Sequence, residues 1–182
     1  MAGNFAAMGA LWDQVLVTLR ALPWLLPCLP LALGAGWFVS RVAGHAGRPS
    51  HAAAAFLITA STIIIAVATL APPLDGYHFG DRVGPCLMGN WEPTWAFWRP
   101  SSASLNVLLF IPLGAGVALA RRPAFWLVPG LALSIAVEGC QHFLPFTLRS
   151  CDSQDIADNW FGLLMGFALA AAASRLPSLR GR

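Results

Sequence analysis

The sequence predicts an all-α protein, a polytopic membrane helix bundle of about five transmembrane helices. Of its 182 residues 57% are hydrophobic and only 10% are charged, whereas soluble domains carry roughly 25% charged residues. Five stretches also reach the roughly 20 apolar residues that are needed to cross the hydrocarbon core of a bilayer. So few charges cannot cover a water-exposed surface, and we therefore expect the lipid bilayer itself to be the main partner of the chain.

The five predicted spans form one transmembrane domain, residues 21–176. The first span contains Pro23, Pro27 and Pro30, which we expect to kink its outer half. Before it, residues 1–20 have apolar residues at helical spacing and are predicted to form an interfacial segment, and residues 177–182 form a short tail. The predicted spans are residues 21–42, 52–71, 104–120, 124–143 and 155–174.

The arginines predict the orientation, because short loops rich in arginine stay in the cytoplasm. Seven arginines fall at or beyond span ends on one side, and no acidic residue accompanies them. All eight acidic residues fall toward the other side, with the outer loops 72–103 and 144–154. We therefore expect the amino terminus outside and the carboxyl terminus in the cytoplasm. The seven arginines are Arg41, Arg48, Arg121, Arg122, Arg175, Arg180 and Arg182.

The long outer loop, residues 72–103, is rich in proline, glycine and tryptophan. Its Trp91, Trp95 and Trp98 fit an interfacial aromatic belt. A loop of more than about 15 residues without secondary structure is usually functional. We expect it to lie on the membrane surface as a lid or to form a short re-entrant turn, and the sequence leaves both open.

The formal net charge of +3 does not indicate a nucleic-acid partner. The arginines occur singly or in pairs between apolar segments, so they form no basic surface of the kind that binds phosphates. No cysteine and histidine spacing typical of zinc is present, and we predict no metal and no cofactor.

Three of the four cysteines fall on or near the predicted outer side, where disulfides can form. A bridge from Cys86 to Cys151 would join the two outer loops. Cys140 is the competing partner, and three free thiols remain the alternative.

The fourth and fifth spans each carry polar residues on one helical face. Ser134, Glu138 and Gln141 are spaced by four and three residues, so they lie on the same side of the fourth helix. A carboxylate at membrane depth costs at least about 2.5 kcal/mol, so Glu138 should be paired, protonated or hydrated.

On the fifth span the same spacing places Asp155, Asn159, Gly162 and Gly166 on one face. The two glycines form a GxxxG pair that allows close helix packing. Asp152 or Ser153 is expected to cap this helix.

These faces are expected to converge with Asn106, at the start of the third span, and with Arg149, in the loop between the last two spans. Arg149 is the cation available to pair with Glu138 or Asp155, or to hold an anionic head group in a bidentate manner. The predicted outer polar pocket consists of Asn106, Glu138, Gln141, Arg149, Asp152, Asp155 and Asn159.

The order and spacing of these residues resemble those of VanZ-like membrane proteins. The matching pattern is N106-x3-F-x-P-x-G, then E138-x-x-Q141, then R149-x2-D152-x2-D155-x3-N159-x2-G162-x3-G166. The resemblance covers about residues 104 to 170. It implies an all-helical protein of the bacterial cytoplasmic membrane with a role in the envelope. One member of the family is associated with resistance to the lipoglycopeptide teicoplanin.

Three functions fit the polar pocket. It could bind an envelope lipid or another amphiphile, including a lipoglycopeptide. It could be the site of a membrane-embedded enzyme that uses Glu138 and Asp155 as acid and base on a lipid ester or phosphate. It could also be a hydrogen-bonded clasp that holds three helices together without a ligand.

Overall fold

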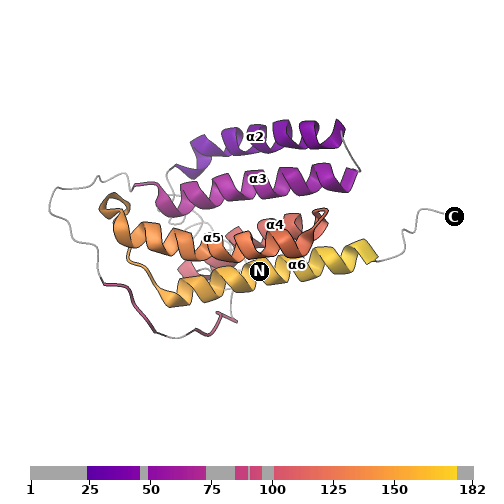
Figure 1. Cartoon of the computed structure of the whole chain (residues 1–182). Helices are drawn as coiled ribbons and strands as arrows, with labels where there is room; N and C mark the ends of the chain where they lie inside the picture. Colours follow the sequence, from indigo (N-terminus) through magenta and orange to yellow (C-terminus); the bar gives the residue numbers. More distant parts are fainter. Residues whose placement is uncertain (1–23, 46–48, 73–84, 90, 96–100, 176–182) are drawn as a thin grey trace, which may run out of the picture.

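A computed structural model describes residues 24–45, 49–72, 85–89, 91–95 and 101–175. This part of the chain is a bundle of α-helices (Figure 1). It contains no named strand, and a single parallel bridge joins Leu87 to Asp152. The predicted all-α class is therefore confirmed. The elements are α2 (Leu25–His45), α3 (Pro49–Leu70), α4 (Ser102–Leu119), α5 (Pro123–Phe143), the 3₁₀ turn η1 (Pro145–Thr147) and α6 (Ser153–Arg175).

The helices have the length and composition of membrane spans. Four of them, α2, α3, α5 and α6, are long and apolar enough to cross a bilayer. The fifth, α4, has 18 residues and is therefore about 27 Å long, slightly less than the roughly 30 Å of a hydrocarbon core. It lies between α3 and α6 and packs on both. Because its helices have the length and apolar composition of membrane spans, the chain is a helical membrane protein.

Each predicted span corresponds to one helix, although the ends differ by a few residues. The largest difference is in α2, which begins at Leu25 instead of residue 21 and continues to His45. Pro27 falls in its first turn, where its missing N–H removes no intrahelical hydrogen bond. Pro30 is thus the one proline inside this helix. The predicted interfacial segment 1–20 and the tail 177–182 lie outside the described residues.

The helices pack in a row, with α2 on α3, α3 on α4 and α4 on α6, while α5 contacts α3, α4 and α6 less extensively (Figure 1). The α4–α6 crossing is the closest, because glycines bring the two backbones together. A Cβ atom built on Gly162 would lie 2.1 Å from the Val107 carbonyl oxygen, and one on Gly166 would lie 2.0 Å from that of Ile111. Gly114 is the counterpart on α4, since its Cβ would lie 1.9 Å from the Leu163 carbonyl oxygen.

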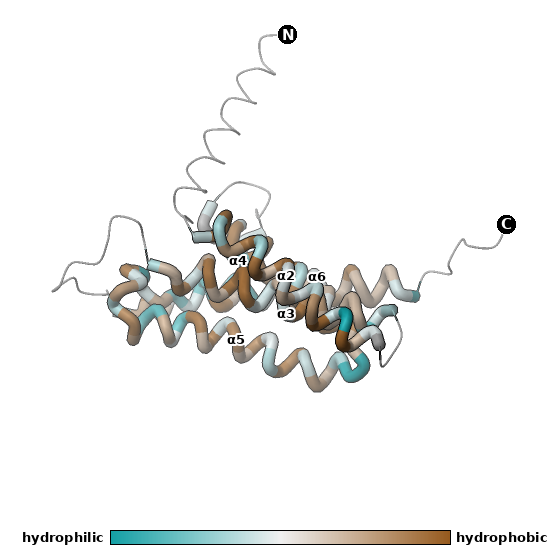
Figure 2. Tube along the Cα trace, turned by 90° about the horizontal axis from the view of Figure 1, so that it is seen from above, coloured by the Kyte–Doolittle hydropathy of each residue, from teal (hydrophilic) through white to brown (hydrophobic). Residues whose placement is uncertain are grey.

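The buried core is small and apolar, as expected for helices that pack in lipid. Its members are Ile65 of α3, Phe110 and Leu113 of α4, Val137 of α5 and Leu163 of α6. Figure 2 shows apolar residues along the helices and hydrophilic residues toward their ends.

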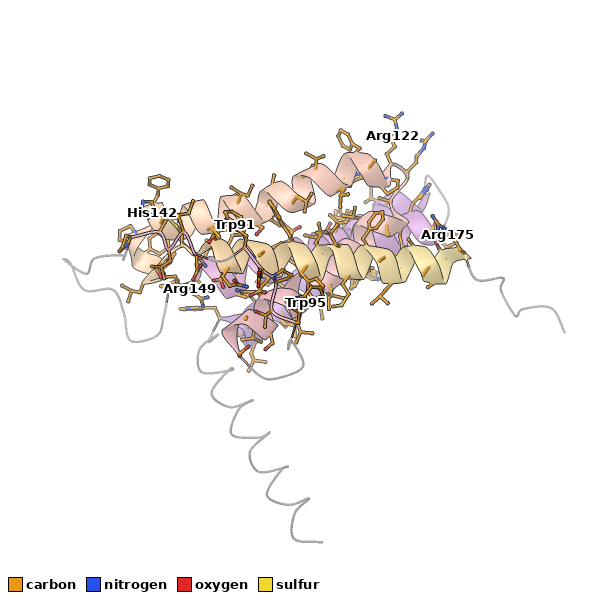
Figure 3. All side chains as sticks on the ribbon, turned by 90° about the horizontal axis from the view of Figure 1, so that it is seen from below. Trp91, Trp95, Arg122, His142, Arg149 and Arg175 are labelled. Atoms are coloured by element: carbon orange, nitrogen blue, oxygen red, sulfur yellow. A yellow bond between two sulfur atoms is a disulfide. The ribbon has the colours of Figure 1, made fainter. Side chains whose placement is uncertain are left out.

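The two ends of the bundle differ in chemistry. Arg122 and Arg175 lie at one end, whereas His142 and Arg149 lie at the other (Figure 3). We call the second end the polar end. The carboxyl ends of α3 and α5 and the amino ends of α2, α4 and α6 meet there.

Candidate functional site

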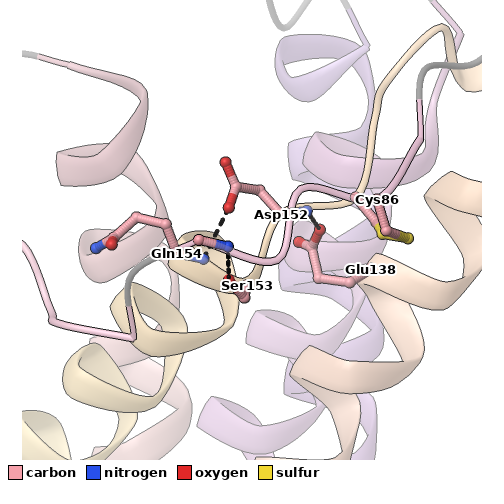
Figure 4. The surroundings of a disulfide bond; sticks show 7 residues. Cys86, Glu138, Asp152, Ser153 and Gln154 are labelled. Atoms are coloured by element: carbon pink, nitrogen blue, oxygen red, sulfur yellow. Dashed lines mark hydrogen bonds between the residues drawn. A yellow bond between two sulfur atoms is a disulfide. The ribbon is translucent and has the colours of Figure 1, made fainter.

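Part of the long loop packs against the first turns of α6. We call residues 85–89 and 91–95 the strap. Its Cys86 is bonded to Cys151, with 4.7 Å between the two Cα atoms (Figure 4). Beside this disulfide the Leu87 N–H donates to the Cys151 carbonyl, and the Leu87 carbonyl accepts from the Ser153 N–H at 3.0 Å. The strap and the start of α6 are therefore joined both covalently and through their backbones.

Further along, α6 side chains satisfy the strap backbone. The hydroxyl of Ser153 accepts from the Gly89 N–H at 3.0 Å, and Gln154 donates to the Glu92 carbonyl. The fully buried Asp158 accepts from both the N–H and the hydroxyl of Thr94, at 2.5 and 3.1 Å. Backbone polar groups at membrane depth need such protein partners because no water replaces them.

The strap follows α6 toward the middle of the bundle. The rings of Trp91 and Trp160 are tilted by 39° with centroids 6.3 Å apart, and Trp95 meets the Phe161 ring edge-on at 5.1 Å. The contacts run from the start of α6 to Phe161, which is roughly 12 Å along the helix axis. The described part of the loop therefore lies along the first turns of α6.

The disulfide makes a direct chemical prediction. Alkylation of denatured but unreduced protein should modify two cysteines, Cys28 and Cys140, which are free in the structure. After reduction all four should react, and peptide mass spectrometry should show Cys86 linked to Cys151 only in the unreduced sample. Alkylation of Cys86 without reduction would contradict the bond.

Beneath the strap, Glu138 joins α5 to the start of α6. Its side chain is 4% exposed, and its Oε2 accepts from the Asp152 N–H at 2.9 Å. Asp152 in turn caps α6, because its Oδ1 accepts from the Gln154 N–H at 2.9 Å (Figure 4). The start of α6 is thus stabilised by two carboxylates, that of Asp152 directly before the helix and that of Glu138 from α5.

Three more hydrogen bonds tie α5 to other helices, and one of them runs from the Trp160 indole N–H of α6 to the Leu131 carbonyl of α5 at 3.0 Å. The Gln141 amide donates to the Thr69 carbonyl of α3 at 3.0 Å, and the Asn159 amide of α6 donates to the Ser134 hydroxyl at 3.1 Å. Since α5 has few other contacts, these bonds and the Glu138 bond form a clasp that fixes its position. Within the described residues, the Oδ1 of Asn159 is the one buried side-chain polar atom without a partner.

Three predicted pocket residues lie outside this clasp. Asn106 of α4 interacts with the carboxylate of Asp155 in the first turn of α6. Arg149 is half-buried near Asp155 and Glu138, but its guanidinium makes no hydrogen bond or ion pair with residues of the described part. Asn106, Arg149 and Asp155 form what we call the open group.

The electrostatics of Arg149 follow from its surroundings. Partial burial lowers the pKa of the Arg149 guanidinium from its ordinary value, and the carboxylates of Asp155 and Glu138 oppose that change. Arginine keeps its charge at neutral pH because its intrinsic pKa is above about 12. Arg149 is therefore a partly desolvated cation whose five N–H donors make no hydrogen bond to the described residues.

The backbone before Arg149 is strained. Leu148 has φ of 51°, and no other non-glycine residue in the described ranges has a positive φ. The left-handed conformation costs an L-residue roughly 1–2 kcal/mol. Such strain often occurs at functional sites, and here it lies at the turn that leads from η1 to Arg149.

The two disulfide cysteines and the nearby His142 are residues of the types that bind metals. One ring nitrogen of His142 and the sulfurs of Cys86 and Cys151 lie within 4.8 Å of one another. Because the thiolate is the form that binds a metal, the disulfide leaves these two sulfurs unable to act as thiolate ligands.

The structure divides the predicted pocket into two sets. Glu138, Gln141, Asp152 and Asn159 make hydrogen bonds to other helices or cap α6, whereas Asn106 and Asp155 interact with each other and Arg149 lies near Asp155. The residue pattern alone gave no role to Thr94, Gln154 or Asp158, which the structure places between the strap and α6. The signal that was available for Asp158 is its position among apolar residues, where a carboxylate needs a partner.

These features define a class: a helical membrane protein with a polar clasp and a disulfide-bonded strap at one end of its bundle. Comparison with models of known families gives a match to VanZ/LLP1 over residues 81–174, more than half of the chain. The chain belongs to the VanZ/LLP1 family. The matched region contains the strap and α4 to α6, so it extends the resemblance found in the sequence to part of the long loop. A search of curated proteins and of solved structures found no match.

Proposed function

We propose that this protein binds the head group of an amphiphile through the open group Asn106, Arg149 and Asp155. In this proposal the polar end faces outward from a bacterial cytoplasmic membrane, with the carboxyl terminus in the cytoplasm. The distribution of arginines supports the orientation, because Arg41, Arg121, Arg122 and Arg175 all belong to the opposite end of the helices.

The observation that carries the proposal is the environment of Arg149. A half-buried cation loses part of its hydration, and this loss is compensated only when its donors find acceptors. The described residues supply no such acceptor within hydrogen-bonding distance. A phosphate or carboxylate of a ligand would match the planar guanidinium in a bidentate manner.

The neighbours of Arg149 add a second requirement for the head group. Asp155 lies near the guanidinium and interacts with Asn106. Its carboxylate would repel a purely anionic head group and would accept a hydrogen bond from a hydroxyl or an ammonium. The best fit is an anionic group that also carries a hydrogen-bond donor.

The clasp residues differ from the open group in that their polar atoms already have partners within the protein. Glu138 already accepts a backbone N–H in a buried position, so it is poorly placed to act as a mobile acid or base. We therefore favour binding over the enzyme alternative and assign the structural role to Glu138, Gln141, Asp152 and Asn159.

A resistance assay tests the proposed function at the cellular level. Bacteria would express the wild type, Arg149→Gln or Arg175→Gln at equal membrane levels. We expect the wild type and Arg175→Gln to raise several-fold the concentration of a lipid-tailed, teicoplanin-type glycopeptide that is needed to stop growth. Arg149→Gln should lose this effect, because hydrogen bonds to a charged group contribute about 1.5–3 kcal/mol, a factor of roughly ten or more in affinity.

A tail-less glycopeptide provides the comparison for the amphiphile requirement. We expect no protection against it from any of the three proteins. Arg175 is the matched control because it is exposed at the opposite end of α6. Equal protection by Arg149→Gln and wild type would overturn the role of Arg149, and absence of protection by the wild type would overturn the link to glycopeptide resistance.

A further inference from the structure

An apolar groove lies on the side of α4 that faces away from α6. Leu105, Leu108, Leu109 and Pro112 line it, and their spacing of three, four and seven residues places them on one face of the helix. The opposite face, with Val107 and Ile111, meets the glycines of α6. The helix α4 therefore separates the groove from the α4–α6 crossing.

The other walls of the groove come from α2 and α3. Leu25 and Leu33 contribute from α2, and Phe56, Leu57 and Ile64 contribute from α3. Ala60 and Ser61 are small and buried, so they form its floor. The groove has a volume of about 340 Å³, and Ser61 is the only polar residue among the described residues that line it.

The position of the groove along the helices matches one leaflet of a bilayer. Its lining runs from residue 25 to 33 on α2, from 56 to 64 on α3 and from 105 to 112 on α4. Each of these segments is roughly 10–12 Å long, compared with about 15 Å for half of a 30 Å hydrocarbon core. The groove begins at the first residue of α2 and the first turns of α4, which is the polar end of the bundle.

The groove and the open group share the start of α4. Leu105 lines the groove, and the next residue, Asn106, interacts with Asp155. Successive residues lie about 100° apart around a helix axis, so the groove and the open group lie on different faces of α4, near the same end of that helix.

We propose that this groove binds one acyl chain of a membrane lipid from the leaflet at the polar end. The lipid is a glycerophospholipid with an anionic head group, and its chain enters sideways from the bilayer. A concave groove between three helices offers the chain contacts on more sides than a flat helix surface does, so dispersion attraction holds it there. The identity of the head group rests on the proposed function, whereas the binding of the chain does not.

Photolabelling tests the proposal on the full chain in membranes. The probe is phosphatidylglycerol with a diazirine on one acyl chain, in vesicles of phosphatidylglycerol and phosphatidylethanolamine, and labelled peptides are identified by mass spectrometry. We expect labelling of the wild type to concentrate on the groove segments of α2, α3 and α4. Leu108→Trp should fill the groove and reduce this labelling several-fold.

Leu164→Trp is the matched control. Leu164 of α6 is 48% exposed and Leu108 is 50% exposed, but Leu164 does not line the groove. Labelling of the groove should therefore be unchanged in Leu164→Trp. Leu33→Trp, on the α2 wall, provides a second blocking variant should Leu108→Trp fail to fold.

The outcomes separate the groove from the head-group site. Labelling spread evenly over lipid-facing helix surfaces, or unchanged labelling in both blocking variants, would overturn the acyl-chain site. Labelling that survives in Arg149→Gln but disappears in Leu108→Trp would support the groove and overturn the head-group role of Arg149. Loss of labelling in both Arg149→Gln and Leu108→Trp, with Leu164→Trp unaffected, would support a single lipid that occupies the groove and the head-group site.

Discussion

Replacing Gly162 or Gly166 with valine is expected to destabilise the protein strongly and to lower the yield of folded protein several-fold. The Cβ atoms would approach the Val107 and Ile111 carbonyl oxygens to 2.1 and 2.0 Å. Because these oxygens belong to the backbone, no side-chain rotation can relieve the overlap, and α4 and α6 must move apart. Overpacking costs about 1–3 kcal/mol and sometimes more, which is a large part of a total stability of 5–15 kcal/mol.

The measurement is the yield of monodisperse protein after purification in detergent, together with its thermal stability. Gly34→Val in α2 and Gly139→Val in α5 are matched controls, since a Cβ built at either position meets no described atom within 4 Å beyond its chain neighbours and the nearby backbone of its own helix. Both controls should retain most of the wild-type yield. If Gly162→Val were as stable as Gly139→Val, the close α4–α6 crossing would be wrong.

Replacing Glu138 with leucine is expected to destabilise the protein by about 1–3 kcal/mol, because a buried N–H would be left without its acceptor. The donor that would lose its acceptor is the Asp152 N–H at the start of α6, which donates to Oε2 of Glu138. Glu138→Gln keeps an amide oxygen that can accept the same hydrogen bond, so its stability should be close to that of the wild type.

Thermal unfolding of the two variants measures this difference, and hydrogen exchange localises it. Exchange at Asp152 and over the first turn of α6 should be faster in Glu138→Leu and nearly unchanged in Glu138→Gln. Were both variants equally stable, the hydrogen bond would contribute little and Glu138 would be free for a functional role. A stable Glu138→Gln that loses all protection against the lipid-tailed glycopeptide would point to the same conclusion.

The helices could be predicted from the sequence because the bilayer sets their length. A span must contain about 20 apolar residues and satisfy its own backbone hydrogen bonds, which leaves few alternatives. The start of α6 was also readable, since Asp152 has the right residue type and position for a cap. The start of α2 was not, because three prolines allow several first residues and only the folded backbone selects Leu25.

The partners of the polar residues could not be predicted, because they come from distant parts of the chain. Asp158 holds Thr94, which is 64 residues earlier, and Gln141 reaches Thr69 across 72 residues. Helical spacing shows which residues share a face, but the rotation of each helix and its crossing angle decide what that face meets. Arg149 illustrates this limit, since both carboxylates near it were candidates for a direct ion pair and it makes one with neither in the described part.

The sequence by itself determined the all-α membrane class, the five apolar segments, the grouping of arginines at one end and the family pattern on α4 to α6. Each of these depends on composition or on spacing along one helix, which a linear chain displays directly. Only the tertiary structure decided that the strap lies along α6, that four of the pocket residues form hydrogen bonds within the protein, and that Arg149 makes no ion pair with the described residues. Those features depend on how separate helices are placed against one another, and packing energies between helices, summed over many weak contacts, set that placement.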